Sequence, residues 1–130
     1  MVSHTKKKVV ILGATGSVGV NTLRVIEQFP ERFEVLGLTA YRNVKLLAEQ
    51  ARRFNPRRIT VGSREDAENL AASLRLPSVQ IGYGVEDLIE IATLKDADLI
   101  VSSIVGAAGL VPTLAAVRAG KRIALANNET

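Results

Sequence analysis

Near the start of the chain, a short apolar segment runs into three glycines spaced three residues apart: Gly13, Gly16 and Gly19. Two hydroxyl side chains, Thr15 and Ser17, lie between them. A glycine turn between a strand and a helix exposes backbone N–H groups at the positive end of the helix dipole, and these groups bind phosphate oxygens. The pattern predicts a dinucleotide site in which Gly13 permits a tight turn, Gly16 lets the backbone approach a diphosphate and Gly19 lets the helix pack on the sheet. The alternative is a tight structural connection without a ligand.

The second apolar segment, residues 33–40, is followed by Tyr41, Arg42 and Asn43, and no carboxylate appears between Gly37 and Asn43. An NAD site usually has Asp or Glu here for the ribose 2′-hydroxyl, whereas an NADP site has a basic residue for the 2′-phosphate. Because a guanidinium donates two parallel hydrogen bonds to a phosphate, Arg42 favours NADP. An ordinary surface arginine before a helix is the alternative.

Other candidate groups are few. Ser102, Ser103 and Gly106 follow an apolar segment at residues 97–104 and would lie over the middle of the cofactor, although a structural loop explains such small residues nearly as well. His4 is the only histidine, and the chain has no cysteine, which excludes thiolate chemistry and disulfides. Since the sequence shows no acid–base pair and no cluster of metal ligands, we expect no catalytic and no metal-binding residue in this chain.

Strands and helices are expected to alternate along the whole chain. The apolar patterns predict strands at residues 9–12, 33–40, 58–61, 79–81, 97–104 and 121–126, and helices at 20–29, 43–54, 63–74, 85–93 and 112–120. Asn43 and Ser63 are expected to cap their helices, Pro112 to open the last helix and Gly120 to end it. Because each return to a parallel neighbour needs a crossover, this order predicts an α/β protein with a Rossmann-like, doubly wound, mostly parallel sheet and helices on both faces.

The composition is that of one globular domain, with 130 residues of which 47% are hydrophobic and 23% charged. We expect residues 1–8 to form a disordered basic lead-in and residues 9–130 to form the domain. No apolar run is long enough to span a membrane and the start does not read as a secretory signal, so we expect a cytoplasmic protein without a membrane partner. The net charge of +4, concentrated in the first half of the chain, suits a phosphate ligand or a solvated surface. With 4% aromatic residues and no Trp, no nucleic-acid partner is expected.

Three segments of the chain resemble the 1-deoxy-D-xylulose 5-phosphate reductoisomerase family. They are ILGATGSVG (residues 11–19), IVGAAGLVPTLAAVRAGK (104–121) and LANNE (125–129). The resemblance begins at Lys8 and covers only the amino-terminal, NADPH-binding part of a family member. It implies an NADPH-dependent oxidoreductase that rearranges and reduces the phosphosugar 1-deoxy-D-xylulose 5-phosphate to 2-C-methyl-D-erythritol 4-phosphate in non-mevalonate isoprenoid precursor biosynthesis. It also implies a Mg²⁺ or Mn²⁺ ion that holds the substrate's oxygens, and a homodimeric parent enzyme.

The resemblance also assigns roles to individual residues. It implies that the diphosphate of the cofactor is bound by Thr15, Gly16, Ser17 and Val18. It implies that the 2′-phosphate is bound by Arg42 and Asn43. After the last strand, it implies that the cofactor is contacted by Asn127 and Glu129. Tyr41 stands where the family often has Gly, and Arg42 stands where it has Lys. Asn128 stands where the family has a lysine that reaches the substrate, and this change removes a charge-assisted contact to an anion.

The family's metal-binding carboxylates and substrate lid would follow Thr130, so the catalytic and C-terminal domains are expected to be absent. The chain alone is expected to bind NADPH without turnover. One alternative is the NADP-binding domain of another reductase such as aspartate-semialdehyde dehydrogenase, which shares the glycine pattern but uses a catalytic cysteine. The other is a non-catalytic nucleotide-binding module.

Overall fold

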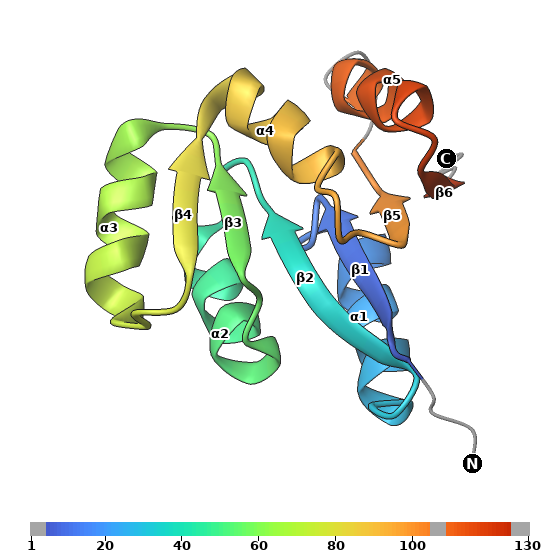
Figure 1. The fold of residues 1–130 in the computed structure, drawn as a ribbon. Helices are drawn as coiled ribbons and strands as arrows, with labels where there is room; N and C mark the ends of the chain where they lie inside the picture. The colour runs from blue at the N-terminus through green and yellow to red at the C-terminus, as the bar shows by residue number, and fades with distance from the viewer. Residues whose placement is uncertain (1–4, 105–108, 126–130) are drawn as a thin grey trace.

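The structure is a computed structural model that describes residues 5–104 and 109–125, and within them six strands alternate with five helices (Figure 1). The strands are β1 (Lys7–Leu12), β2 (Phe33–Thr39), β3 (Arg58–Val61), β4 (Gln80–Tyr83), β5 (Leu99–Ser102) and β6 (Arg122–Leu125). The helices are α1 (Ser17–Gln28), α2 (Val44–Phe54), α3 (Arg64–Leu74), α4 (Gly84–Ala92) and α5 (Leu110–Arg118). The sheet has the order β4-β3-β2-β1-β5-β6, and each neighbouring pair is parallel. The predicted Rossmann-like α/β fold is confirmed.

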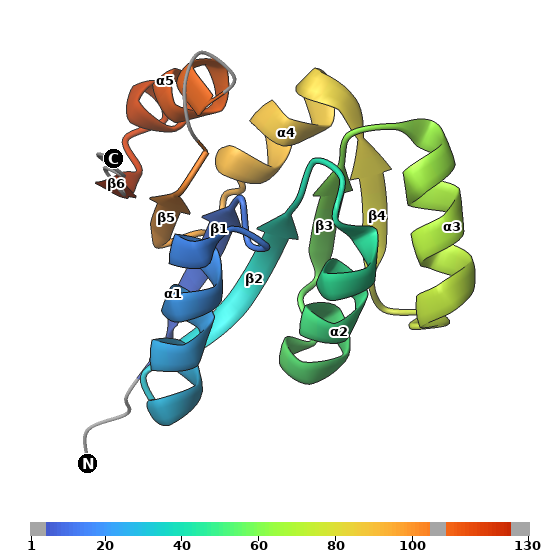
Figure 2. The same ribbon diagram turned by 180° about the vertical axis from the view of Figure 1, so that it is seen from behind.

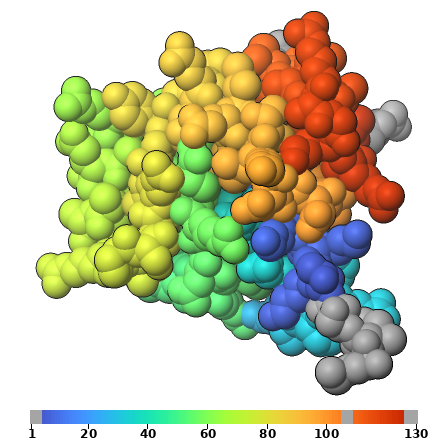
Figure 3. Space-filling model, in the orientation of Figure 1, coloured from blue at the N-terminus to red at the C-terminus, as the bar shows by residue number. Residues whose placement is uncertain are grey.

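Helices cover both faces of the sheet. Helices α1, α2 and α3 lie on one face, whereas α4 and α5 lie on the other (Figures 1 and 2). Figure 3 shows α4 and α5 side by side over the second face. Because side chains alternate along a strand, β1 supplies both cores: Val9 and Ile11 face α1, whereas Val10 and Leu12 face α4. All four are buried, so β1 is covered on both faces, as a continuous apolar run in a parallel sheet indicates.

The predicted helix caps are confirmed. Asn43 Oδ1 accepts a hydrogen bond from the N–H of Leu46 at 3.2 Å, at the start of α2. Ser63 Oγ accepts one from the N–H of Asp66 at 3.2 Å, at the start of α3. Each cap satisfies a donor that the first helical turn leaves unpaired.

Several predicted boundaries were wrong by a few residues. β1 begins at Lys7 rather than residue 9, because the N–H of Lys7 donates to Arg32 O at 2.8 Å, so Lys7 and Lys8 belong to the sheet and not to the lead-in. α5 begins at Leu110, two residues before Pro112; the proline still lies in the first turn, where no N–H is needed. β4 extends to Tyr83, which pairs with Val61 of β3. Apolar patterns indicate burial, whereas strand ends depend on pairing with distant residues.

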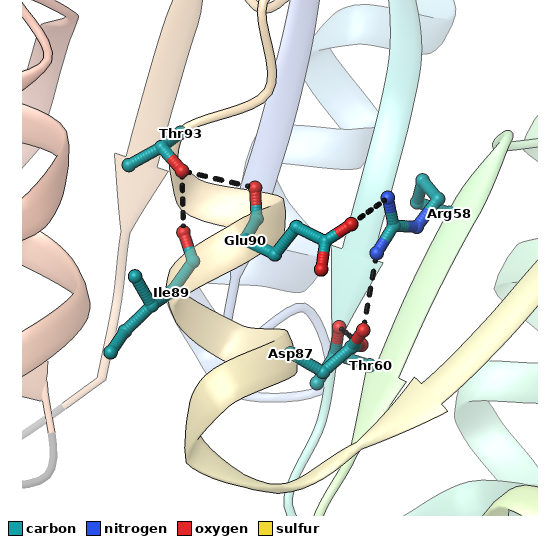
Figure 4. A network of polar contacts seen from close by, with 6 residues as sticks. All are labelled: Arg58, Thr60, Asp87, Ile89, Glu90 and Thr93. Carbon is teal, nitrogen blue, oxygen red and sulfur yellow. Dashed lines mark hydrogen bonds and ion pairs between the residues drawn. The ribbon is translucent and has the colours of Figure 1, made fainter.

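Helix α4 is fixed to the sheet by a polar network that the sequence did not predict (Figure 4). The Arg58 guanidinium on β3 contacts Asp87 Oδ1 and Glu90 Oε1, both at 3.1 Å. The Thr60 hydroxyl donates to the second oxygen of Asp87. Within the described ranges, no helix is long and apolar enough to cross a membrane.

Candidate functional site: a dinucleotide-binding turn

The turn between β1 and α1 has the geometry that its glycines predicted. Gly13 has a φ of +83°, a left-handed conformation that favours glycine. A Cβ on Gly19 would lie 2.6 Å from both Cα and O of Ala14, so only glycine permits this close approach of α1 to the turn. A Cβ on Gly16 would lie 3.7 Å from Gly13 O, its nearest neighbour, and the residue is exposed. The roles expected for Gly13 and Gly19 are confirmed, and Gly16 leaves an open backbone surface.

The start of α1 offers unpaired donors. Over residues 5–104 and 109–125, no hydrogen bond is found for the N–H of Ser17, Val18 or Gly19. The first turn of α1 contains no acidic residue, and Gly16 at the N-cap has no side chain to cap it. Ser17 is exposed and Thr15 is half-buried. Free N–H groups and an unneutralised helix dipole form a site that suits an anion.

Three residues hold this turn in place, and two of them, Thr39 and Gln50, were not predicted from the sequence. Thr39 Oγ1, at the end of β2, accepts from the N–H of Gly13 at 2.9 Å. Gln50 Nε2, from α2, donates to Ala14 O at 2.8 Å. Gln50 is only 7% exposed and shares its helix face with apolar residues. A polar residue on an apolar helix face was the available signal, because buried polar groups have hydrogen-bond partners.

Ser103, the third such residue, connects the turn to β5. Its hydroxyl lies 2.7 Å from Gly13 O and 3.0 Å from Leu12 O, and both carbonyls can accept from it. Ser102 is buried, and its Oγ accepts from Thr113 Oγ1 at 3.4 Å. Both serines therefore have partners within the protein, which agrees with the structural alternative for this segment. Gly106 lies outside the described residues.

At the end of β2, Arg42 and Tyr41 lie next to each other in space. The Arg42 guanidinium carbon is 5.3 Å from the centroid of the Tyr41 ring, and Tyr41 as a whole residue is 72% exposed. No ion pair involves Arg42 in the part of the chain that the structure describes. Asn43 caps α2 through Oδ1, so only its amide N–H₂ group remains free to donate to a ligand.

These groups all lie at the carboxyl edge of the sheet, where the strand order reverses. β1 pairs with β2 on one side and with β5 on the other, so the chain crosses to opposite sides of β1. In open parallel sheets, ligands bind at this reversal, beyond the carboxyl ends of the strands. Asn127, Asn128, Glu129 and His4 lie outside the described residues. Among the described residues, no group of three or more His, Cys, Asp or Glu side chains could hold a metal ion.

A parallel sheet with a glycine turn at the reversal of its strand order, and a guanidinium past the next strand, defines a Rossmann-type α/β domain. The family model for 1-deoxy-D-xylulose 5-phosphate reductoisomerase matches residues 9–130, and the chain therefore belongs to that family. This match contradicts the aspartate-semialdehyde dehydrogenase alternative.

Individual relatives and solved structures agree with the family. A reductoisomerase from a Synechococcus species is 50% identical over 125 residues, which cover 94% of this chain and 32% of that protein. One from Geobacter metallireducens is 48% identical over 124 residues, which cover 95% and 32%. A Zymomonas mobilis reductoisomerase solved in complex with NADPH has a TM-score of 0.88 at 43% identity, over 95% of this chain and 32% of that one. A reductoisomerase solved with NADPH, fosmidomycin and magnesium has a TM-score of 0.87 at 43% identity, over 93% and 30%. The chain spans about a third of the length of the curated relatives it matches.

Proposed function

We propose that this chain forms the NADPH-binding part of an enzyme that rearranges and reduces 1-deoxy-D-xylulose 5-phosphate to 2-C-methyl-D-erythritol 4-phosphate. The observation that carries the proposal is the exposed, Cβ-free turn at Gly16, followed by three helical N–H groups without partners among the described residues. The family supports the choice of reaction, and a relative solved with NADPH supports the choice of cofactor. The parent enzyme acts on a phosphosugar in the cytoplasm and is a homodimer in this proposal.

The diphosphate of NADPH binds at the start of α1. The N–H groups of Ser17 and Val18 donate to its oxygens, and the hydroxyls of Thr15 and Ser17 add further hydrogen bonds. Gly16 lets the diphosphate approach the backbone because no Cβ projects from this exposed residue. When bound, NADPH supplies the hydride for the reduction.

The 2′-phosphate binds at the end of β2. Arg42 has no carboxylate partner among the described residues, so its charge is available to a phosphate, and charge-assisted bidentate hydrogen bonds are among the strongest in proteins. The Asn43 amide donates to the same phosphate while its oxygen caps α2. A bound 2′-phosphate also lies close to the first turn of α2, which contains no acidic residue.

Three further roles rest on sequence position within the family. Asn127 and Glu129 contact the cofactor after the last strand, and Asn128 replaces a lysine that reaches the substrate. We assign no metal ligand to the described residues. The Mg²⁺ or Mn²⁺ ion of the proposed enzyme would be held by residues outside the described ones, and we expect these 130 residues alone to bind NADPH without turnover.

Calorimetric titration of the chain with NADPH and with NADH tests the cofactor assignment. We expect NADPH to bind more tightly, and Arg42→Glu to weaken NADPH by more than about tenfold while changing NADH little, because only NADPH carries the phosphate that the new carboxylate repels. Arg32→Glu is the matched control, since Arg32 is also exposed but precedes β2 at the opposite edge of the sheet. Equal NADPH affinity in the Arg42→Glu variant and the unmodified chain would contradict the assignment.

A second assay tests the absence of turnover. The chain is mixed with NADPH, 1-deoxy-D-xylulose 5-phosphate and Mn²⁺, and the nicotinamide absorbance is followed. We expect a constant signal, and a steady metal-dependent decay would show that the catalytic groups lie within these 130 residues.

A further inference from the structure

Tyr41 is the most exposed of the large apolar and aromatic side chains in the described structure, with 72% of its surface open to solvent. It follows β2 at the carboxyl edge of the sheet, on the same side as the glycine turn. Exposing an aromatic ring to water costs free energy, and packing against the rest of the described chain leaves most of Tyr41 uncovered.

The ring is nevertheless fixed at one edge. A Cβ placed on Gly62, the residue after β3, would lie 2.8 Å from Tyr41 Cδ2, 2.9 Å from Cε2 and 2.7 Å from Tyr41 O. The ring edge and its backbone therefore lie directly against Gly62, and any larger residue there would displace them. This contact positions the ring between the ends of β2 and β3.

The Arg42 guanidinium lies over the same ring. Its carbon is 5.3 Å from the ring centroid, within the range of cation–π contacts. A planar guanidinium that stacks on a ring keeps its N–H groups free at its edges, where they can donate to a phosphate. Tyr41 thereby restricts a long, flexible side chain to one region before any ligand arrives, which lowers the entropy cost of binding.

Adenosine 2′-phosphate, one half of NADPH, carries the two kinds of group that an aromatic ring and a guanidinium bind. In adenosine 2′-phosphate, the base and the phosphate are carried by adjacent ribose carbons, so a ligand that places its phosphate on Arg42 brings its base close to Tyr41. Bases stack on exposed aromatic rings. We propose that Tyr41 determines cofactor affinity and specificity: its ring stacks with the adenine and positions Arg42 for the 2′-phosphate. This inference rests on the proposed NADPH-binding function.

Calorimetry with Tyr41→Leu, Tyr41→Phe and Tyr83→Leu variants of the chain tests the role of the ring. Tyr83 is the matched control, because it is the other tyrosine, is 47% exposed and ends β4 at the same edge of the sheet. Tyr41→Leu is expected to weaken NADPH by about tenfold or more and NADH by less, so that the preference for NADPH falls. Tyr41→Phe and Tyr83→Leu are expected to keep both affinities within about threefold. A loss that is equal for the two cofactors, or no loss at all, overturns the proposal.

Fluorescence gives an independent readout of stacking. The chain has two tyrosines and no tryptophan, so Tyr41 is the only tyrosine left to fluoresce in the Tyr83→Leu variant. Saturating adenosine 2′-monophosphate is expected to quench its emission, and unchanged emission despite calorimetric binding overturns the stacking. If the unmodified chain binds no NADPH, the proposed function itself fails. If it binds NADPH and Tyr41→Leu binds equally well, only the role of Tyr41 fails.

Discussion

Gly16 and Gly19 are chemically identical, yet the structure gives them separate tasks. A Cβ on Gly19 would be 2.6 Å from backbone atoms of Ala14, which cannot move without displacing the turn. A Cβ on Gly16 would meet only Gly13 O, at 3.7 Å, and the residue has a φ of −76° that any amino acid adopts. Gly19 is therefore required for the fold, and Gly16 is available for a ligand.

Alanine at each position separates these two tasks. We expect Gly19→Ala to lower the free energy of unfolding by about 3 kcal/mol, since overpacking against backbone outweighs the roughly 1 kcal/mol gained in helix propensity. Gly16→Ala is expected to cost about 1 kcal/mol or less in stability, as for an N-cap change, and to weaken NADPH by more than about tenfold. Urea unfolding and calorimetry measure the two effects, and a fully stable Gly19→Ala variant would contradict the packing argument.

At the scale of single residues, the sequence predicted hydrogen bonds only between residues that are close together along the chain. The caps of Asn43 and Ser63 bond to residues three positions further along, so their types and spacing were sufficient. The bonds that hold the glycine turn link Gly13 to Thr39 and to Ser103, across 26 and 90 residues. Such partners depend on which strands lie side by side, and this information is absent from the spacing of residues along one segment.

Helix α4 shows how an element is fixed by polar contacts between distant segments. Its apolar spacing predicted a helix at residues 85–93, but not its attachment to β3 by Arg58 and Asp87. The Arg58 and Asp87 side chains are 12% and 18% exposed, so removal of either one leaves the charge of the other largely buried and poorly compensated. Glu90, the second partner of Arg58, is 63% exposed and well solvated.

The difference in burial predicts unequal effects of two truncations. Asp87→Ala is expected to lower the free energy of unfolding by about 3 kcal/mol, because it leaves the Arg58 charge poorly compensated and removes the acceptor of Thr60. Glu90→Ala is expected to cost less than about 1 kcal/mol, as for an exposed ion pair. Urea denaturation of both variants is the measurement. Losses below about 1 kcal/mol in both variants would show that α4 is held mainly by its apolar face instead.

At the scale of the whole molecule, β1 joins the two halves of the fold. It pairs with β2 and β5, and its side chains enter both hydrophobic cores. The alternation of strands and helices was sufficient to predict a parallel sheet with helices on both faces. The position at which the strand order reverses could not be predicted from the sequence, since short apolar segments such as β3, β4 and β5 have no pattern that specifies their neighbours.

A ligand at this reversal contacts segments that follow β1 and β2, so its binding free energy is added to the stability of the sheet as a unit. NADPH at about 100 times its dissociation constant is expected to stabilise the folded chain by about 2.7 kcal/mol, which corresponds to a rise in Tm of roughly 10 °C for a domain of this size. NADH at the same concentration is expected to give a smaller rise, because it lacks the phosphate that Arg42 binds. Added salt is expected to reduce the difference between the two cofactors by screening that contact. Differential scanning calorimetry measures all three effects, and equal rises in Tm with NADPH and NADH at low salt would contradict a phosphate site at Arg42.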